Sequence, residues 1–191
     1  GVSGISGLVT SANSLVGGRV SDQVGSDGVT ALTNGNYVVS SRNWDNGAIT
    51  DAGAVTFGSG VSGISGLVTS ANSLVGGTAS DAVGNGGVTA LTNGNYVVRS
   101  FNWDNPSPAI TNVGAVTWGN GTSGTVGLVT SANSLVGGTA SDSVGNSGVT
   151  ALTNGNYVVR SQSWDNPSPA AVNAGAVTWG SGTSGTVGLI T

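Results

Sequence analysis

Apolar residues along the chain come in short runs, separated by glycine, serine, threonine and asparagine. Valine and threonine are frequent in and around these runs, whereas glutamate, lysine and methionine, which favour helices, are absent. β-Branched residues favour strands, and glycine and asparagine favour the tight turns between strands. The runs show no 3.6-residue period of the kind that an amphipathic helix requires. The pattern therefore predicts an all-β protein.

One nine-residue phrase, ALTNGNYVV, occurs three times without a substitution, at residues 31–39, 90–98 and 151–159. In each copy an Asn-Gly pair lies between two short apolar segments. Asn and Gly tolerate the positive φ that tight hairpin turns need. We therefore expect each copy of the phrase to form a β-hairpin.

The hairpin phrase is part of a longer repeat, because SANSLVGG and WDN recur with the same offsets of 59 and then 61 residues. We divide the chain into units at residues 1–59, 60–120 and 121–181, with the start of a fourth unit at 182–191. The two-residue difference between the first two units is localised to the connection at 47–49 in the first unit and at 106–109 in the second. Surface loops tolerate such insertions, so we expect a surface loop there.

Each unit is expected to contain four strand segments. In the first unit the predicted segments are residues 14–17, 29–32, 37–43 and 54–57. The aromatic residue of the last segment is Phe57, Trp118 or Trp179 in the successive units. A large aromatic side chain at the same position of every unit predicts a buried ring.

Two repeat architectures fit four strands per unit. In the first, each unit is one four-stranded blade of a β-propeller. In the second, each unit is three coils, of about 20 residues each, in a β-solenoid. We favour the propeller, because equivalent coils have no reason to keep a 60-residue period so strictly.

Charge and side-chain chemistry narrow the possible functions. The 191 residues include four Arg and eight Asp, giving a net charge of −4, and there is no histidine or cysteine. Four dispersed arginines supply no phosphate-binding patch, so we expect no nucleic-acid partner. Histidine catalysis and thiol chemistry are excluded. No apolar run is long enough to span a bilayer, so we expect no membrane insertion. We predict a non-enzymatic protein without a cofactor.

The phrases TALTNGNYVV, WDN, GAVTWGNG and SANSLVGGTASD resemble the tandem repeats of large secreted bacterial surface proteins, the filamentous-haemagglutinin-like adhesins. The likeness covers the whole chain. The LTNGNYVV hairpin is also similar to the first two strands of bacterial propeller repeats, which have Asp-Gly where this chain has Asn-Gly. The resemblance implies an extracellular or cell-surface location and a role in adhesion or in an extracellular fibre.

Two sets of recurring residues are candidates for ligand binding. The first set lies in WDN, where an indole beside carboxylate and amide groups suits a sugar ring. We favour packing of the ring between neighbouring units, because one large ring at a fixed place in every repeat is more often a core residue. The candidate glycan-binding residues are Trp44, Asp45, Trp103, Asp104, Trp164 and Asp165.

The second set is the aspartate of SDxVG: Asp22, Asp81 and Asp142. Such an acid can accept backbone N–H groups as a structural post, or it can bind calcium. The sequence lacks the dense acidic runs of known calcium loops. We therefore predict a structural role for these aspartates and no metal site.

These observations predict a structural or adhesive repeat module that builds a ring or a fibre, with a lectin-like module as the alternative. Propellers usually have about four to eight blades, so three units are too few to close a ring. We therefore expect the chain to form a homo-oligomer or a self-assembling fibre.

Overall fold

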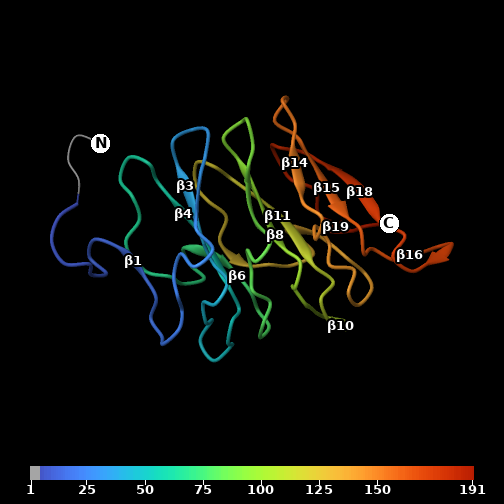
Figure 1. Ribbon diagram of the computed structural model, residues 1–191, viewed down its shortest axis with the longest axis horizontal. Coiled ribbons are helices and arrows are strands. Elements are labelled where there is room, and N and C mark those ends of the chain that lie inside the picture. Colours follow the sequence, from blue (N-terminus) through green and yellow to red (C-terminus); the bar gives the residue numbers. More distant parts are fainter. Residues whose placement is uncertain (1–4) are drawn as a thin grey trace.

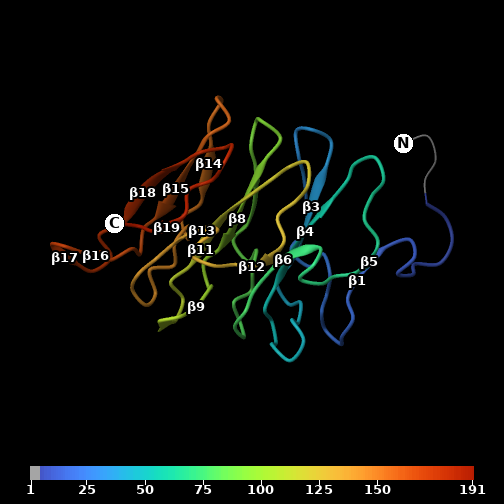
Figure 2. The same cartoon turned by 180° about the vertical axis from the view of Figure 1, so that it is seen from behind.

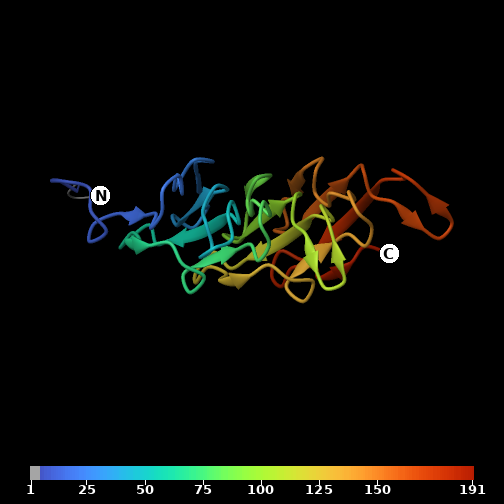
Figure 3. The ribbon, with the colours of Figure 1, turned by 90° about the horizontal axis from the view of Figure 1, so that it is seen from below.

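The computed structural model describes residues 5–191, and every regular element among them is a β-strand. The all-β repeat prediction is confirmed. The strands form a row of similar sheets, and the first described residues lie at the opposite end of that row from the C-terminus (Figure 1). Seen from below, the molecule is elongated along the same direction (Figure 3).

The first complete sheet contains four antiparallel strands in the order β2, β3, β4, β6. They span Val29–Ala31 (β2), Tyr37–Ser41 (β3), Ala54–Gly58 (β4) and Ser73–Val75 (β6). The second sheet repeats this order with Gly87–Ala90 (β7), Tyr96–Ser100 (β8), Ala115–Gly119 (β11) and Ser134–Val136 (β13). The third sheet has Val149–Ala151 (β14), Tyr157–Ser161 (β15) and Ala176–Gly180 (β18).

The fourth strand of the first and second sheets comes from the following copy of the repeat, which differs from the prediction. We expected residues 14–17 to join the sheet of Val29 and Tyr37. Instead β4 pairs with Ser73–Val75, the equivalent segment one copy later. The predicted repeat units that begin at residues 60 and 121 therefore start between the third and fourth strands of a sheet.

Short parallel pairs join each unit to the next. Leu15–Val16 (β1) pairs with Gly66–Leu67 (β5), and β6 pairs with Gly127–Leu128 (β12). The last such pair joins β13 to Gly188–Leu189 (β19). The view from behind shows β12 beside β6 (Figure 2). Parallel pairing is a solenoid feature, but the paired residues are more than 50 positions apart, and within a unit the strands run antiparallel. Twenty-residue coils are therefore not the repeating element.

The predicted hairpin turns are present in all three copies. The Gly35 N–H donates to the Leu32 carbonyl at 3.0 Å, and the Leu32 N–H donates to the Asn36 carbonyl at 2.8 Å. Gly35 has a φ of +87°, which an L-residue rarely adopts. This is the three-residue hairpin with glycine in the left-handed region. The repeated phrase thus encodes a turn, as its sequence predicts.

The inserted loop also lies where the sequence predicts. Residues 106–109 are exposed, and this loop forms a small hairpin from Asn105–Pro106 (β9) and Ala109–Ile110 (β10). The third copy forms the same hairpin from Asn166–Pro167 (β16) and Ala170–Ala171 (β17). In the shorter first copy an isolated bridge from Asn46 to Ile49 takes its place.

The core lies between successive sheets, which pack face to face. Val97 and Val98 are adjacent on β8 and point to opposite faces of their sheet, as strand geometry requires. Val98 packs with Val38 and Val55 of the first sheet, and Val97 packs with Tyr157 of the third. The middle sheet is thus covered on both faces.

The ring position of the third strand is partly buried rather than fully buried. Phe57 and Trp118 pack against the two core clusters as partly buried side chains. Trp179 of the third sheet is 56% exposed. The degree of burial depends on whether another sheet follows.

Candidate functional site

The three WDN tryptophans are buried in the structure. Trp44, Trp103 and Trp164 are 5%, 1% and 7% exposed. The Trp44 N–H donates to the Ser41 carbonyl, and the Gly53 N–H donates to the Trp44 carbonyl. WDN therefore lies just after β3. The two backbone hydrogen bonds of Trp44 stabilise the loop that connects β3 to β4. The ring of each of these tryptophans packs inward.

The aspartate of SDxVG is also buried, and it organises the backbone around the tryptophan. Asp81 is 0% exposed. Its Oδ2 accepts the N–H groups of Gly77 and Thr78 at 2.9 and 2.8 Å. Its Oδ1 accepts the N–H of Asp104, the WDN aspartate, at 2.9 Å.

The same three bonds occur at the other two copies of this aspartate. Asp22 accepts from Gly18, Arg19 and Asp45. Asp142 accepts from Gly138, Thr139 and Asp165. One carboxylate thus ties the chain after SLVGG to the WDN segment in every unit. The predicted structural post is confirmed.

The aspartate of WDN accepts a further backbone N–H from the loop that follows it. Asp104 Oδ1 accepts from Asn112 at 2.6 Å, and Asp165 Oδ1 accepts from Asn173 at 2.7 Å. In the first copy Asp45 Oδ1 accepts from Asp51 at 2.9 Å. The donor residues have φ near +50°, so the carboxylate holds a turn that is unfavourable for non-glycine residues.

Burial raises the pKa of the Asp81 carboxyl to about 6, the nearby Asp104 charge adds to the rise, and the three N–H donors oppose it. Because this folded pKa lies above the ordinary value of 3.8, the folded protein binds more protons than the unfolded chain between these values. The stability that this group contributes is present below pH 3.8 and is lost as pH rises through about 6.

We therefore expect the free energy of unfolding to fall by roughly 2–3 kcal/mol because of this group between pH 4 and 7. Urea denaturation at several pH values measures the slope, and Asp81→Asn is the control that removes the titrating group. An unchanged slope in the variant would contradict the assignment to Asp81. NMR titration of the Asp81 carboxyl carbon in the unaltered chain reads the pKa directly.

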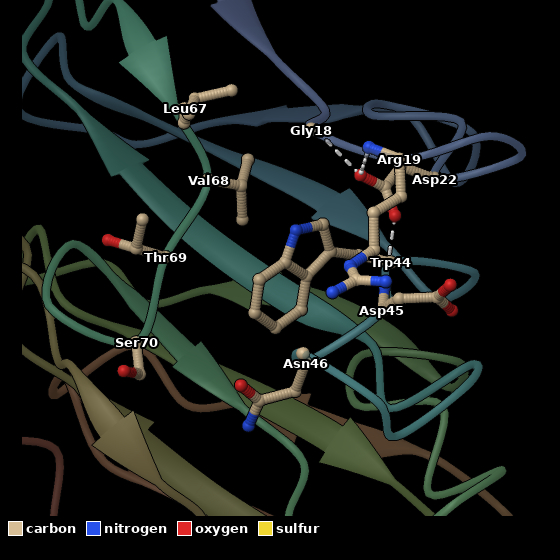
Figure 4. Close-up of a pocket in the computed structure, with 11 residues that line it drawn as sticks. Gly18, Arg19, Asp22, Trp44, Asp45, Asn46, Leu67, Val68, Thr69 and Ser70 are labelled. Atoms are coloured by element: carbon tan, nitrogen blue, oxygen red, sulfur yellow. Dashed lines mark hydrogen bonds between the residues drawn. The ribbon is translucent and has the colours of Figure 1, made fainter.

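The first and third WDN segments lie beside cavities at equivalent places. A cavity of about 270 Å³ in the first unit is lined by Arg19, Asp22, Trp44 and Asp45, together with Leu67–Ser70. Figure 4 shows the Trp44 ring between the Val68–Thr69 stretch and the loop of Arg19 and Asp22. A cavity of about 250 Å³ at Asp142, Trp164 and Leu189 repeats it in the third unit. The glycan role of the six WDN residues stays a prediction.

Comparison with known protein families matches residues 1–26, 31–85, 90–146 and 151–191 to the family described as "Repeat of unknown function (DUF5650)". The match covers most of the chain. The chain belongs to the DUF5650 repeat family. The tandem repeat is therefore confirmed, whereas the likeness to haemagglutinin-like adhesins stays a prediction. A search of curated proteins finds no match.

Each complete DUF5650 match overlaps most of one four-stranded sheet. The matched segment 31–85 runs from the hairpin to the buried Asp81 and contains most of the first four-stranded sheet. It also contains Gly84, where the following unit meets the first. One family repeat therefore includes most of a sheet and the segment that covers its face.

Within residues 5–191, no group of three or more acidic side chains is placed to hold a metal ion. The two aspartates of each unit are instead occupied with backbone N–H groups. The described residues also contain no helix that could span a membrane.

Sequence reasoning missed the asparagines that join one DUF5650 repeat to the next. The Asn34 side-chain amide donates to the carbonyls of Gly94 and Gly121, at 3.3 and 2.7 Å. The Asn93 amide donates to the Gly182 carbonyl at 2.8 Å. The exact repetition of NGNYVV was the available signal, because a turn alone does not need every side chain conserved.

Proposed function

We propose that this chain is a non-enzymatic structural repeat module that builds an extended scaffold in an extracellular or cell-surface protein of bacteria. The observation that carries the proposal is that the same junction between units occurs twice in one open row. Repeat proteins of this kind extend by one fixed step for each added unit.

The two junctions use equivalent contacts. Val83 of the second unit donates its N–H to the Ala52 carbonyl of the first at 3.0 Å, and Val144 donates to the Val113 carbonyl, also at 3.0 Å. At the hairpin end of the units, Thr33 donates its hydroxyl to the Leu91 carbonyl and Thr92 donates to the Leu152 carbonyl. Bonds at both ends of each sheet restrict the angle between neighbouring units, as a rigid scaffold requires.

The chemistry of the chain supports a structural role. It has no histidine or cysteine, and its two recurring aspartates per unit bind backbone N–H groups. The location at the bacterial surface is supported by the resemblance of the repeat phrases to those of secreted adhesins.

Small-angle X-ray scattering on chains of different repeat number tests the scaffold proposal. Duplication of residues 60–120 adds one complete period, and deletion of the same residues removes one. We expect the maximum dimension of the monomer to rise and fall by the same increment while the cross-section stays constant. A radius of gyration that barely changes on duplication would contradict the scaffold proposal, because it would indicate a compact or closed arrangement.

A further inference from the structure

Six Asn-Gly pairs occur in the chain, and this dipeptide is the one most prone to spontaneous loss of the asparagine amide. Glycine has no Cβ, so its backbone nitrogen can approach the Cγ of the preceding asparagine with little hindrance. The pairs begin at Asn34, Asn46, Asn85, Asn93, Asn120 and Asn154. Their local sequences are alike, so the fold decides which of them reacts.

In five of the six pairs the attacking glycine nitrogen is held in a hydrogen bond. The Gly86 N–H donates to the Arg99 carbonyl at 3.0 Å, and the Gly121 N–H donates to the Asn95 side chain at 2.9 Å. The three hairpin glycines donate to leucine carbonyls: Gly35 to Leu32, Gly94 to Leu91 and Gly155 to Leu152. In all five pairs the asparagine Oδ1 also accepts a backbone N–H. Attack in these pairs therefore requires both bonds to break.

The Asn46-Gly47 pair differs on both counts. Within residues 5–191 the Gly47 N–H donates to no acceptor and Asn46 Oδ1 accepts no N–H. Gly47 is exposed, and a Cβ built on it would have no atom within 4 Å. The one side-chain bond of Asn46 runs from its amide nitrogen to the Gly76 carbonyl, at 3.0 Å.

The turn that contains Gly47 explains why its N–H has no partner. The backbones of Asn46 and Ile49 bond to each other in both directions, at 2.9 and 3.0 Å, and Gly47 has a φ of +62°. A glycine with positive φ at the first central position is typical of a type II′ hairpin turn. The hydrogen bonds of such a turn use its outer residues, so the Gly47 N–H is left to solvent.

The corresponding asparagines of the second and third units lack the attacking group. Asn105 and Asn166 are followed by proline, which has no N–H. Pro106 is nevertheless exposed, although the second unit is covered on both faces by its neighbours. Exposure of this loop is therefore a property of the repeat, and the residue after the asparagine decides its reactivity.

We propose that Asn46 is a site of spontaneous deamidation, at which the folded chain acquires aspartate and isoaspartate. The Gly47 nitrogen forms a bond to Asn46 Cγ, and the side-chain amide nitrogen leaves as ammonia with the proton that Gly47 gives up. Water then opens the resulting succinimide. Its attack at Cγ gives aspartate, and its attack at the main-chain carbonyl carbon gives isoaspartate.

The reaction removes a contact between the WDN loop of the first sheet and the end of β6. The Asn46 amide donates to the Gly76 carbonyl, whereas the carboxylate that replaces it has no proton to donate. Isoaspartate also adds a carbon to the main chain of the turn, which displaces the Asn46 carbonyl from the Ile49 N–H. We expect the melting temperature to fall and hydrogen exchange at the Ile49 amide to become faster as the modification proceeds.

Mass spectrometry of peptides from the full chain tests the proposal, after incubation at mildly alkaline pH in water labelled with heavy oxygen. The label enters only residues that deamidate during the incubation, and electron-transfer fragmentation distinguishes isoaspartate from aspartate. We expect Asn46 to convert mainly to isoaspartate while the other five pairs stay intact. In urea all six pairs should convert at similar rates, since their protection comes from the fold.

The second copy of the repeat supplies the matched control. Replacement of residues 46–49 by NPSPAI, the sequence of residues 105–110, keeps the asparagine but removes the attacking N–H. We expect no labelled product at that asparagine. Freshly prepared Asn46→Asp supplies the charge without the isoaspartyl link, so it should lose the bond to Gly76 and keep the protection of the Ile49 amide.

An Asn46 side chain that stays intact in the folded chain while it converts in urea would overturn the proposal. Equal conversion of Asn46 and the hairpin asparagines in the folded chain would do the same, because the fold would then select nothing. Labelled product in the loop-exchange variant would exclude Gly47 as the attacking group. The scaffold proposal is judged separately, from the length of the monomer in scattering.

Discussion

Trp103→Ala is expected to lower the free energy of unfolding by about 3–5 kcal/mol, the usual cost of removing a large buried side chain. Trp103 is 1% exposed and belongs to the cluster that joins the first and second sheets. Its removal leaves a cavity inside this core cluster. Urea denaturation followed by circular dichroism measures the loss.

The matched control is Trp179→Ala, because Trp179 is 56% exposed. We expect a loss within about 1 kcal/mol at a protein concentration low enough to keep the chain monomeric. Equal stability of Trp103→Ala and the unaltered chain would show that the ring is not a core residue.

Gly114→Ala is expected to disrupt the junction between the second and third units. A Cβ on Gly114 would lie 2.2 Å from the backbone nitrogen of Val144, which is bonded to the Val113 carbonyl. Backbone cannot move aside as the end of a flexible side chain can. The third unit must therefore shift away from the second and lose the Val144 bond.

Gly175→Ala is the matched control. It shows how much of the loss in Gly114→Ala comes from the positive φ alone and how much comes from the clash with Val144. The φ values of Gly114 and Gly175 are +74° and +75°, so alanine is equally strained at both, but at Gly175 the nearest atom is 3.6 Å away. We expect the strain to cost about 1–2 kcal/mol at either site. Gly114→Ala should lose roughly 1–3 kcal/mol more.

Hydrogen exchange at the Val144 amide gives the local measurement. Its protection should fall in Gly114→Ala and stay unchanged in Gly175→Ala. Equal stabilities of the two variants would contradict the junction described above. Because neighbouring repeats stabilise one another, the loss should also reduce the cooperativity of unfolding.

Several features of this protein were determined by local sequence. The all-β class follows from the predominance of valine, threonine, glycine and asparagine. The Asn-Gly turns follow from the need for positive φ at Gly35 and its equivalents. The surface loop at 106–109 follows from the length difference between copies. Each of these depends on a few neighbouring residues, which is why the sequence alone predicts them.

The burial of the WDN ring could not be decided from the sequence. A tryptophan beside an aspartate suits a sugar site as well as a core position, and the recurrence of one ring per repeat favours the core. In the folded chain, the carboxylate of Asp81 draws the backbone of Asp104 inward, and the Trp103 ring follows into the core. That contact joins residues 23 positions apart, and no local pattern encodes it.

The choice of partner strands was decided by the tertiary structure alone. The phrase ANSLVGG is identical in residues 12–18 and 71–77, so local sequence cannot say which copy completes the sheet of β2, β3 and β4. The structure selects the later copy, because the chain leaving β4 returns antiparallel through β6. The earlier copy forms a parallel pair with β5 instead. A periodic sequence determines its repeating unit but not the phase at which that unit folds, since the phase depends on contacts between copies.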